Sequence, residues 1–226
     1  MKKTNFKYFK NKFKPIKSFS LLGEDILIKS FFHPNYIGNY IDIGSAHPIN
    51  GNNTFLFYKK KWRGMLIDPH NDIYKPKKHR KEDTILNYGI KEIKNKNLKS
   101  DFFYKKSWLE LSSTQLEEFK NLDSFFKEYS QDDPILKKEI ILVDALYIKK
   151  NFNYDHLDLL SVDIEMYSEK IVIDFIEHFN PKVIIYEKNR KDATNWQKFN
   201  YELVASNEMN NILINQKYKK KNIFDY

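Results

Sequence analysis

Hydrophobic and polar positions follow two rhythms along the chain, and the alternation between them predicts an α/β domain. Short apolar runs of strand length are separated by segments in which apolar residues recur at helical spacing. The expected strands are residues 39–43, 64–67, 84–88, 102–104, 140–148, 157–162, 183–186, 201–205 and 211–215. The expected helices are residues 22–32, 52–60, 113–129 and 170–179.

This order indicates a mostly parallel central sheet with helices on both faces and a C-terminal antiparallel hairpin. Residues 102–104 and 140–148 are expected to be extra strands around the polar helix at 113–129. The length of 226 residues suits one domain with a proper core. We therefore expect a basic N-terminal arm at residues 1–18 and a single domain at 19–226.

The predicted strands place several polar residues where a ligand would lie. In an open parallel sheet the ligand binds beyond the carboxyl ends of the strands, where the strand order reverses. The residues that directly follow predicted strands, or end them, include Gly44, Asp68, Asn87, Asp163 and Glu187. The search for chemistry therefore starts at this edge.

The loop after the first strand favours a cofactor without phosphates. Gly44 permits a close approach of backbone and ligand, and an acid at the end of the second strand, here Asp68, is the usual partner of the ribose hydroxyls of an adenosine cofactor. The loop continues as Ser45-Ala46-His47-Pro48 and is not a G-x-G-x-x-G loop. A pyrophosphate needs several free backbone N–H groups, and Pro48 has none. S-adenosylmethionine is thus favoured over NAD.

The stretch GNYIDIGSAHPINGNNTFLFYKKKWRGMLIDP, residues 38–69, resembles the FkbM-type methyltransferases. The shared features are a strand ending in Asp-Ile-Gly, a following Pro, an Asn-Thr pair, Phe-Tyr, a Trp-x-Gly step and Ile-Asp-Pro. Four later or flanking pieces also fit the family pattern: GED at 23–25, LSVDIE at 160–165, PKVIIYE at 181–187 and NILI at 211–214. The resemblance covers residues 19–216.

The chain departs from the family pattern at four positions. Met166 stands where a glycine usually follows Asp-x-Glu, and Ser168 where an acid is usual. Leu21 and Lys61 replace a glutamine before GED and a glycine before tryptophan. The Met166 change concerns the acceptor side and leaves the cofactor half untouched.

The resemblance implies a Rossmann-like class I fold, S-adenosylmethionine as cofactor, and O-methylation of a sugar, a glycan or a small-molecule hydroxyl. The expected cofactor residues are Glu24, Asp42, Gly44, Ser45, Asp68, Asn87 and Asp163. For Asp68, ribose binding is favoured over a helix N-cap. Asp42 either orients the loop or binds the methionine ammonium. Glu24 either reaches the same ammonium or is a solvated acid, and Asn87 either contacts adenine or caps a turn.

Three residues are candidates for the catalytic base. Asp163 follows the fourth parallel strand and could accept the proton of the acceptor hydroxyl or hold the methionine ammonium, and Glu165 could share either task. His47 is a rival base because imidazole titrates near neutral pH, although a lone loop histidine is more often structural. For Asp163 and Glu165 the alternative is that they are ordinary loop acids.

The formal net charge of +9 leaves the partner open. An anionic partner such as RNA would fit, and Tyr8, Phe9 and Phe13 between lysines could stack on bases. The charge is spread along the chain, however, so biased codon usage and a solvated arm are favoured. An RNA methyltransferase and a cofactor-binding relic without turnover, suggested by Met166 and Ser168, remain the alternatives.

Composition excludes other chemistry. The chain has no cysteine, so thiolate metal sites, disulfides and cysteine nucleophiles are excluded, and a cytoplasmic location is expected. No apolar run approaches the ~18 residues of a membrane span. His70, His79 and Asp72 lack a metal-site spacing, so no metal is expected.

Overall fold

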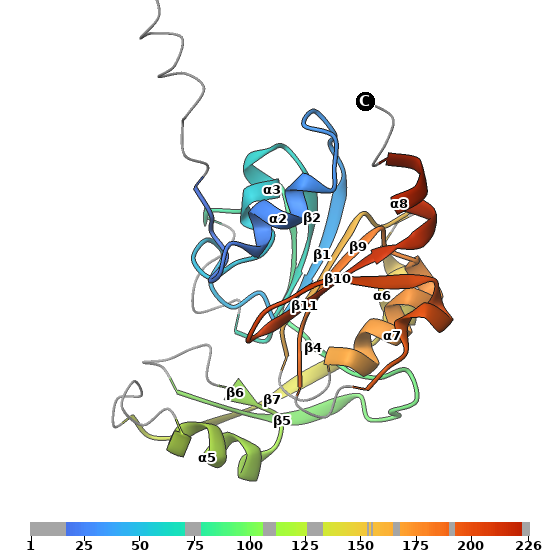
Figure 1. The fold of residues 1–226 in the computed structure, drawn as a ribbon. Helices are drawn as coiled ribbons and strands as arrows, with labels where there is room; N and C mark the ends of the chain where they lie inside the picture. Colours follow the sequence, from blue (N-terminus) through green and yellow to red (C-terminus); the bar gives the residue numbers. More distant parts are fainter. Residues whose placement is uncertain are drawn as a thin grey trace, which may run out of the picture.

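The computed structural model describes residues 17–70, 78–105, 112–125, 133–152, 154, 156–164, 168–189 and 193–222. Within these residues a seven-stranded sheet has the order β10-β11-β9-β8-β1-β2-β3 (Figure 1). Its strands are β1 (Asn39–Ile43), β2 (Arg63–Ile67), β3 (Thr84–Leu86), β8 (Leu159–Val162), β9 (Val183–Glu187), β10 (Tyr201–Ser206) and β11 (Asn210–Asn215).

The sheet is mixed. Five neighbouring strands, in the sheet order β3-β2-β1-β8-β9, pair in parallel. Strand β11 is antiparallel both to β9 and to β10. The expected α/β architecture and the C-terminal hairpin are therefore confirmed. Helices α2 (Glu24–Ser30), α3 (Phe55–Lys59), α6 (Ala145–Asn151), α7 (Ser168–Phe179) and α8 (Gln216–Asn222) accompany it, with a 3-10 turn η2 (Trp196–Phe199).

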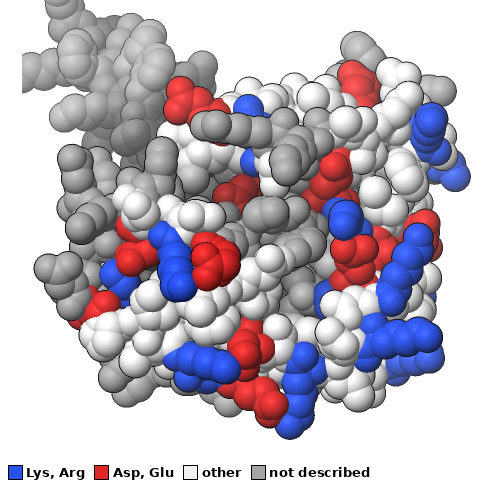
Figure 2. All heavy atoms as spheres, turned by 90° about the horizontal axis from the view of Figure 1, so that it is seen from below, with Lys and Arg blue, Asp and Glu red and all other residues white. Residues whose placement is uncertain are grey.

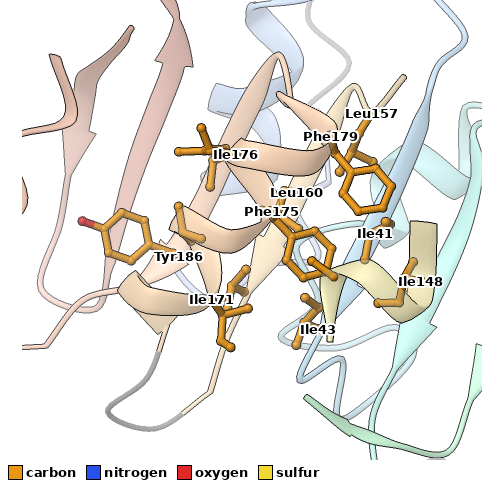
Figure 3. Close-up of a cluster of buried hydrophobic side chains, with 14 of the residues drawn as sticks. Ile41, Ile43, Ile148, Leu157, Leu160, Ile171, Phe175, Ile176, Phe179 and Tyr186 are labelled. Carbon is orange, nitrogen blue, oxygen red and sulfur yellow. The ribbon is translucent and has the colours of Figure 1, made fainter. Parts of the chain in front are cut away.

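The alternation of side chains along β1 divides the core into two layers. Ile41 and Ile43 pack against α6 and α7, where Phe175 and Phe179 cover the sheet (Figure 3). Tyr40 belongs to the opposite layer, with Ile28 of α2 and Phe57 of α3 as further members of that cluster. Both faces of the sheet are covered, which explains why its parallel strands are almost wholly apolar.

A second, four-stranded sheet has the order β4-β7-β5-β6 and lies below the main sheet in Figure 1. Its strands are β4 (Gly89–Ile90), β5 (Lys99–Tyr104), β6 (Ser112–Ser113) and β7 (Leu136–Val143), with α5 (Leu116–Phe125) beside it. Extra strands around a polar helix were expected here, and the structure joins them into one sheet. Residue 88 does not extend β3; the next strand, β4, pairs with β7 instead.

The prediction of a strand over residues 140–148 is wrong beyond Val143. The side chain of Asp144 accepts a hydrogen bond from the backbone N of Tyr147 and caps α6. Ala145 and Ile148, one helical turn apart, are the buried residues of this helix. Residues 140–148 therefore contain the end of β7, the N-cap residue Asp144 and the start of α6. The helix expected at 113–129 begins only at Leu116, because Ser112 and Ser113 pair with β5; residues 126–132 lie outside the described part.

The strand order reverses beside β1, where Gly44 lies between the ends of β2 and β8. Its backbone N donates to Ile67 O, and Asp163 N donates to Ile43 O, each at 2.9 Å. Gly44 has a φ of 73°, and a Cβ there would lie 1.8 Å from the carbonyl oxygen of Asp163. Only glycine fits this junction.

We predict that Gly44→Ala destabilises the protein strongly. Gly51→Ala is the matched control, because Gly51 also has a positive φ (66°) but a Cβ there would meet only Leu21, at 3.6 Å. The control should cost about 1–2 kcal/mol for the left-handed backbone. Gly44→Ala should cost at least about 2 kcal/mol more, within the range of severe single substitutions. Urea unfolding measures both, and equal losses would show that the contact with Asp163 is unimportant.

Candidate active site

A cavity of about 390 Å³ lies between the carboxyl edge of the main sheet and the second sheet. The main sheet contributes Gly44, Ala46, Asp68 and Asp163, and the second sheet contributes apolar side chains that include Phe102, Ile140 and Leu142. Its volume falls within the range of roughly 300–1,000 Å³ found for small-molecule sites. The cavity occupies the position that the strand pattern predicts for a ligand.

Asp68 follows β2 and is 5% exposed. One carboxylate oxygen accepts from Ala46 N at 2.7 Å and the other from His70 N at 2.6 Å. Burial raises the pKa of Asp68 to about 6, against the lowering effect of these two backbone donors. Because each carboxylate oxygen can accept a second hydrogen bond, Asp68 keeps acceptor capacity toward the cavity that it lines.

Asp163 follows β8 and lines both this cavity and a small pocket beside it. Asp163 is exposed. Desolvation by neighbouring protein atoms still raises the pKa of Asp163 to about 7, with further upward contributions from Asp42, Glu24 and Asp68. A carboxyl group that titrates near neutral pH is suited to proton transfer.

Asp42 lies beneath the first loop and is 2% exposed. It accepts hydrogen bonds from Thr54 Oγ1 at 2.6 Å and from Asn52 Nδ2 at 3.0 Å. Burial raises the pKa of Asp42, while Thr54, Arg80 and other partners lower it. These contacts correspond to the loop-orienting alternative for this residue.

Glu24 is buried at the start of α2 and is held by the β10–β11 turn. It accepts from Asn207 Nδ2 at 2.8 Å, Asn210 Nδ2 at 2.9 Å and Leu22 N at 2.9 Å. Burial raises the pKa of Glu24, but these donors outweigh it, so the net shift is downward. Glu24 is therefore not a solvated acid. It is close enough to Asp163 to influence its titration.

The other candidates lie farther from the cavity or beyond the described residues. His47 Nδ1 accepts from the backbone N of Ile49 at 3.1 Å and of Asn50 at 2.9 Å, which is a local turn contact, and His47 is not among the residues that line the cavity. Asn87 is exposed, and its neighbour Tyr88 lines the cavity instead. Ser45 is buried. Glu165 lies outside the described residues.

The sequence did not indicate the place of two residues of this region: Arg80 carried no signal, and His70 was considered only as a metal ligand. Arg80 is fully buried and hydrogen-bonded to the first loop, although in a lysine-rich segment it resembles a surface residue. His70 lines the cavity, with its ring 4.6 Å from the rings of both Phe102 and Tyr104. Both depend on contacts between distant segments. Within the described residues no group of three His, Asp or Glu side chains is placed to hold a metal ion, and Asp72 lies outside them.

Comparison with known proteins identifies the family. Residues 42–220 match the methyltransferase FkbM domain. The chain belongs to the FkbM methyltransferase family. The match begins within β1 and ends within α8, so it includes the carboxyl-edge residues from Asp42 to Asp163.

Other comparisons add little. A search of curated proteins finds no match. The crystal structure of HI0767 from Haemophilus influenzae, described as a candidate methylase, is similar with a TM-score of 0.44 and 10% sequence identity. The alignment covers 85% of this chain and 87% of that one. At this level the likeness carries no argument about function. No helix among the described residues is both long and apolar enough to cross a membrane.

The raised pKa of Asp163 predicts a pH-dependent stability. Its ordinary value is 3.8 and its folded value about 7, so the folded state binds this proton more tightly, and stability falls as pH rises through this window. Asp163→Asn removes the effect. The melting temperature of the variant, minus that of the parent, should therefore grow between pH 5 and pH 8. Asp68→Asn should show the same trend but level off about one pH unit lower, because its folded pKa is about 6. Differences that stay flat with pH in scanning calorimetry would contradict both assignments.

Proposed function

We propose that this protein is an S-adenosylmethionine-dependent O-methyltransferase with a Rossmann-like class I domain. The strand order supports this proposal, because the order in which strands are added reverses beside β1 and the sheet ends in an antiparallel hairpin. The observation that carries the proposal is the cavity at that reversal, with Asp68 and Gly44 in its wall, in a chain of the FkbM methyltransferase family.

The residues present fit the proposed cofactor. Asp68 would accept hydrogen bonds from the ribose hydroxyls, and Gly44 allows the backbone to approach the ligand closely. The apolar side chains Ile90, Phe102 and Leu142 offer a surface for a planar base. The buried Ser45 hydroxyl has no hydrogen-bond partner among the described residues, so it has unused capacity next to Gly44. The loop presents no row of backbone donors suited to a pyrophosphate.

The methyl acceptor would bind on the Asp163 side. A hollow of about 10 Å³ there, with room for about one water, is lined by Asp163, Glu187, Asn53 and Asn210, with Leu21 among its apolar neighbours. The bound cofactor supplies a methyl group on a positively charged sulfur, already activated for displacement. The protein would align the acceptor hydroxyl, and Asp163 would take its proton. Glu165 stays a proposed helper of Asp163.

A nucleic-acid acceptor has less support. Figure 2 shows the face seen from below, where basic and acidic side chains are interspersed. In the second sheet, Lys99 pairs with Glu139 at 2.6 Å and Lys137 with Asp101 at 2.8 Å. The described residues on this face therefore form no continuous basic stripe of the kind that tracks a phosphate backbone. A sugar, glycan or small-molecule hydroxyl is the acceptor that we propose.

Binding of the demethylated product, S-adenosylhomocysteine, tests the cofactor assignment. Asp68→Ala should weaken its affinity in isothermal calorimetry by about 1.5–3 kcal/mol, the range for hydrogen bonds to a charged group. Asp101→Ala, at an exposed carboxylate in the second sheet, is the control and should bind like the parent. If a folded Asp68→Ala variant keeps full affinity, the ribose assignment is wrong.

Turnover tests the base. Asp163→Asn keeps the shape of the side chain and removes the proton acceptor, and general-base catalysis is typically worth about 10²–10⁴ in rate. We expect turnover on a hydroxyl acceptor, followed by mass spectrometry, to fall at least about tenfold, with a smaller change in cofactor affinity. Glu165→Gln should show the same pattern if that residue shares the task.

His47→Gln serves as the comparison for the rival base. Loss of turnover in this variant alone would assign the proton transfer to the first loop. Full turnover in all three variants would mean that positioning drives the reaction without a single base. A parent protein that binds S-adenosylhomocysteine but methylates no acceptor would support the cofactor-binding relic.

A further inference from the structure

Arg80 is a fully buried cation below the first loop. Its Nη1 donates to Pro48 O at 3.1 Å and to Asn52 Oδ1 at 3.2 Å, and its Nη2 donates to Thr54 Oγ1 at 3.0 Å. Arg80 thus holds three points along the segment that connects β1 to α3. An arginine buried so completely needs such acceptors, because an unpaired charge inside a protein is very costly.

The remaining donors of Arg80 face away from the loop. Nε pairs with Asp83 at 2.7 Å, and Nη2 also donates to Tyr40 Oη at 2.9 Å. Burial opposes the charge of Arg80, but the nearby Tyr40, Asp83 and Asp42 outweigh it and raise the pKa of the guanidinium. The cation is therefore permanent.

Two hydroxyl groups on Arg80 Nη2 form matching relays. Thr54 Oγ1 donates to Asp42 Oδ2 at 2.6 Å, and Tyr40 Oη donates to Asp83 Oδ2 at 2.6 Å. Each relay runs from the guanidinium through one hydroxyl to one buried carboxylate. Only the first relay reaches the loop, whereas the second leads to the segment that precedes β3.

The loop relay continues to the cavity wall. Asn52 Nδ2 donates to Asp42 Oδ2 and to the backbone oxygen of Ser45, at 3.0 and 3.2 Å. The next residue, Ala46, has a positive φ of 36° and donates its N to Asp68. The conformation that presents Gly44 and Ala46 to the cavity is thus fixed from below by the contacts of Arg80.

We propose that Arg80 is a positioning residue of the cofactor site, which acts through Thr54 and Asn52 on the loop between β1 and α3. This inference rests on the proposed function, because it assigns the loop to cofactor binding. The residues that Arg80 contacts do not line the cavity, so Arg80 is not placed to touch the ligand and is not a catalytic residue. Its effect reaches the ligand only by holding the backbone beside Gly44 in place.

The matched relays provide the test. Thr54→Val removes the hydroxyl between Arg80 and Asp42 and keeps the shape of the side chain, and Tyr40→Phe removes the equivalent hydroxyl between Arg80 and Asp83. Both variants lose one neutral hydroxyl contact to each of two buried charges, so both should lower the melting temperature. Thr54→Val should in addition weaken S-adenosylhomocysteine binding in calorimetry by about tenfold, the change expected if the roughly 1.4 kcal/mol lost from the hydroxyl contacts must be spent on ordering the loop when the ligand binds.

Two further measurements complete the experiment. Tyr40→Phe should bind S-adenosylhomocysteine within about twofold of the parent, and Thr54→Ser, which restores the hydroxyl, should recover most of the affinity. Equal affinity losses in Thr54→Val and Tyr40→Phe, or unchanged affinity in a folded Thr54→Val, would overturn the positioning role. A parent protein without affinity for S-adenosylhomocysteine would instead reject the proposed function.

Discussion

Three carboxylates that lie close together at the carboxyl ends of adjacent parallel strands impose the main electrostatic constraint on this structure. Asp42 lies one residue before the end of β1, and Asp68 and Asp163 directly follow β2 and β8. Desolvation is the largest cause that raises the pKa of each; Asp42 further raises the pKa of Asp68, and Asp42 and Asp68 both raise that of Asp163. The protein compensates them unequally. Arg80 acts on Asp42 and Lys138 acts on Asp68, while the pKa of Asp163 is raised by every neighbour that affects it. The carboxylate with the least compensation is also the one that faces both hollows.

The three carboxylates therefore differ in how far neighbouring charges and hydrogen-bond donors compensate them, and we connect this difference with different roles. The buried carboxylate of Asp42 accepts hydrogen bonds from the side chains of Asn52 and Thr54, so its acceptor capacity is used within the fold. Asp68 combines two backbone donors with a place in the cavity wall. Under the proposed function, Asp163 is the carboxylate that would exchange a proton or meet a positive charge. The same residue type would then serve three purposes because its surroundings differ.

The sequence predicted those parts of the molecule that follow from local pattern. Each parallel strand shows a short apolar run that ends at a polar residue, so β1, β2, β8 and β9 and the acids beside them were recognisable. Parts of the second sheet, at residues 102–104 and 140–143, were also predicted as strands, but their joining into one sheet was not, because its pairings link segments far apart in the chain.

The failures have specific physical causes. The run from Ile140 to Ile148 is apolar except for Asp144, and the capping contact of that residue divides it into strand and helix. Arg80 resembles one more surface position in a lysine-rich segment, since its buried acceptors other than Asp83 come from residues 26 to 40 positions away. His47 and Asn87 show the converse error, because a favourable place in the sequence did not bring their side chains into the cavity wall.

The pairing of the central strand also bears on how the chain folds. On one side β1 joins β2, which follows within a short distance, but on its other side Tyr40 pairs with Leu159, and the entire second sheet lies between them in the sequence. Contacts across such separations carry a large loop-closure entropy and slow the folding of a domain. During synthesis from the N-terminus, β1 to β3 can therefore assemble early, whereas the cavity wall formed by Gly44 and Asp163 can close only after about three quarters of the chain has been made.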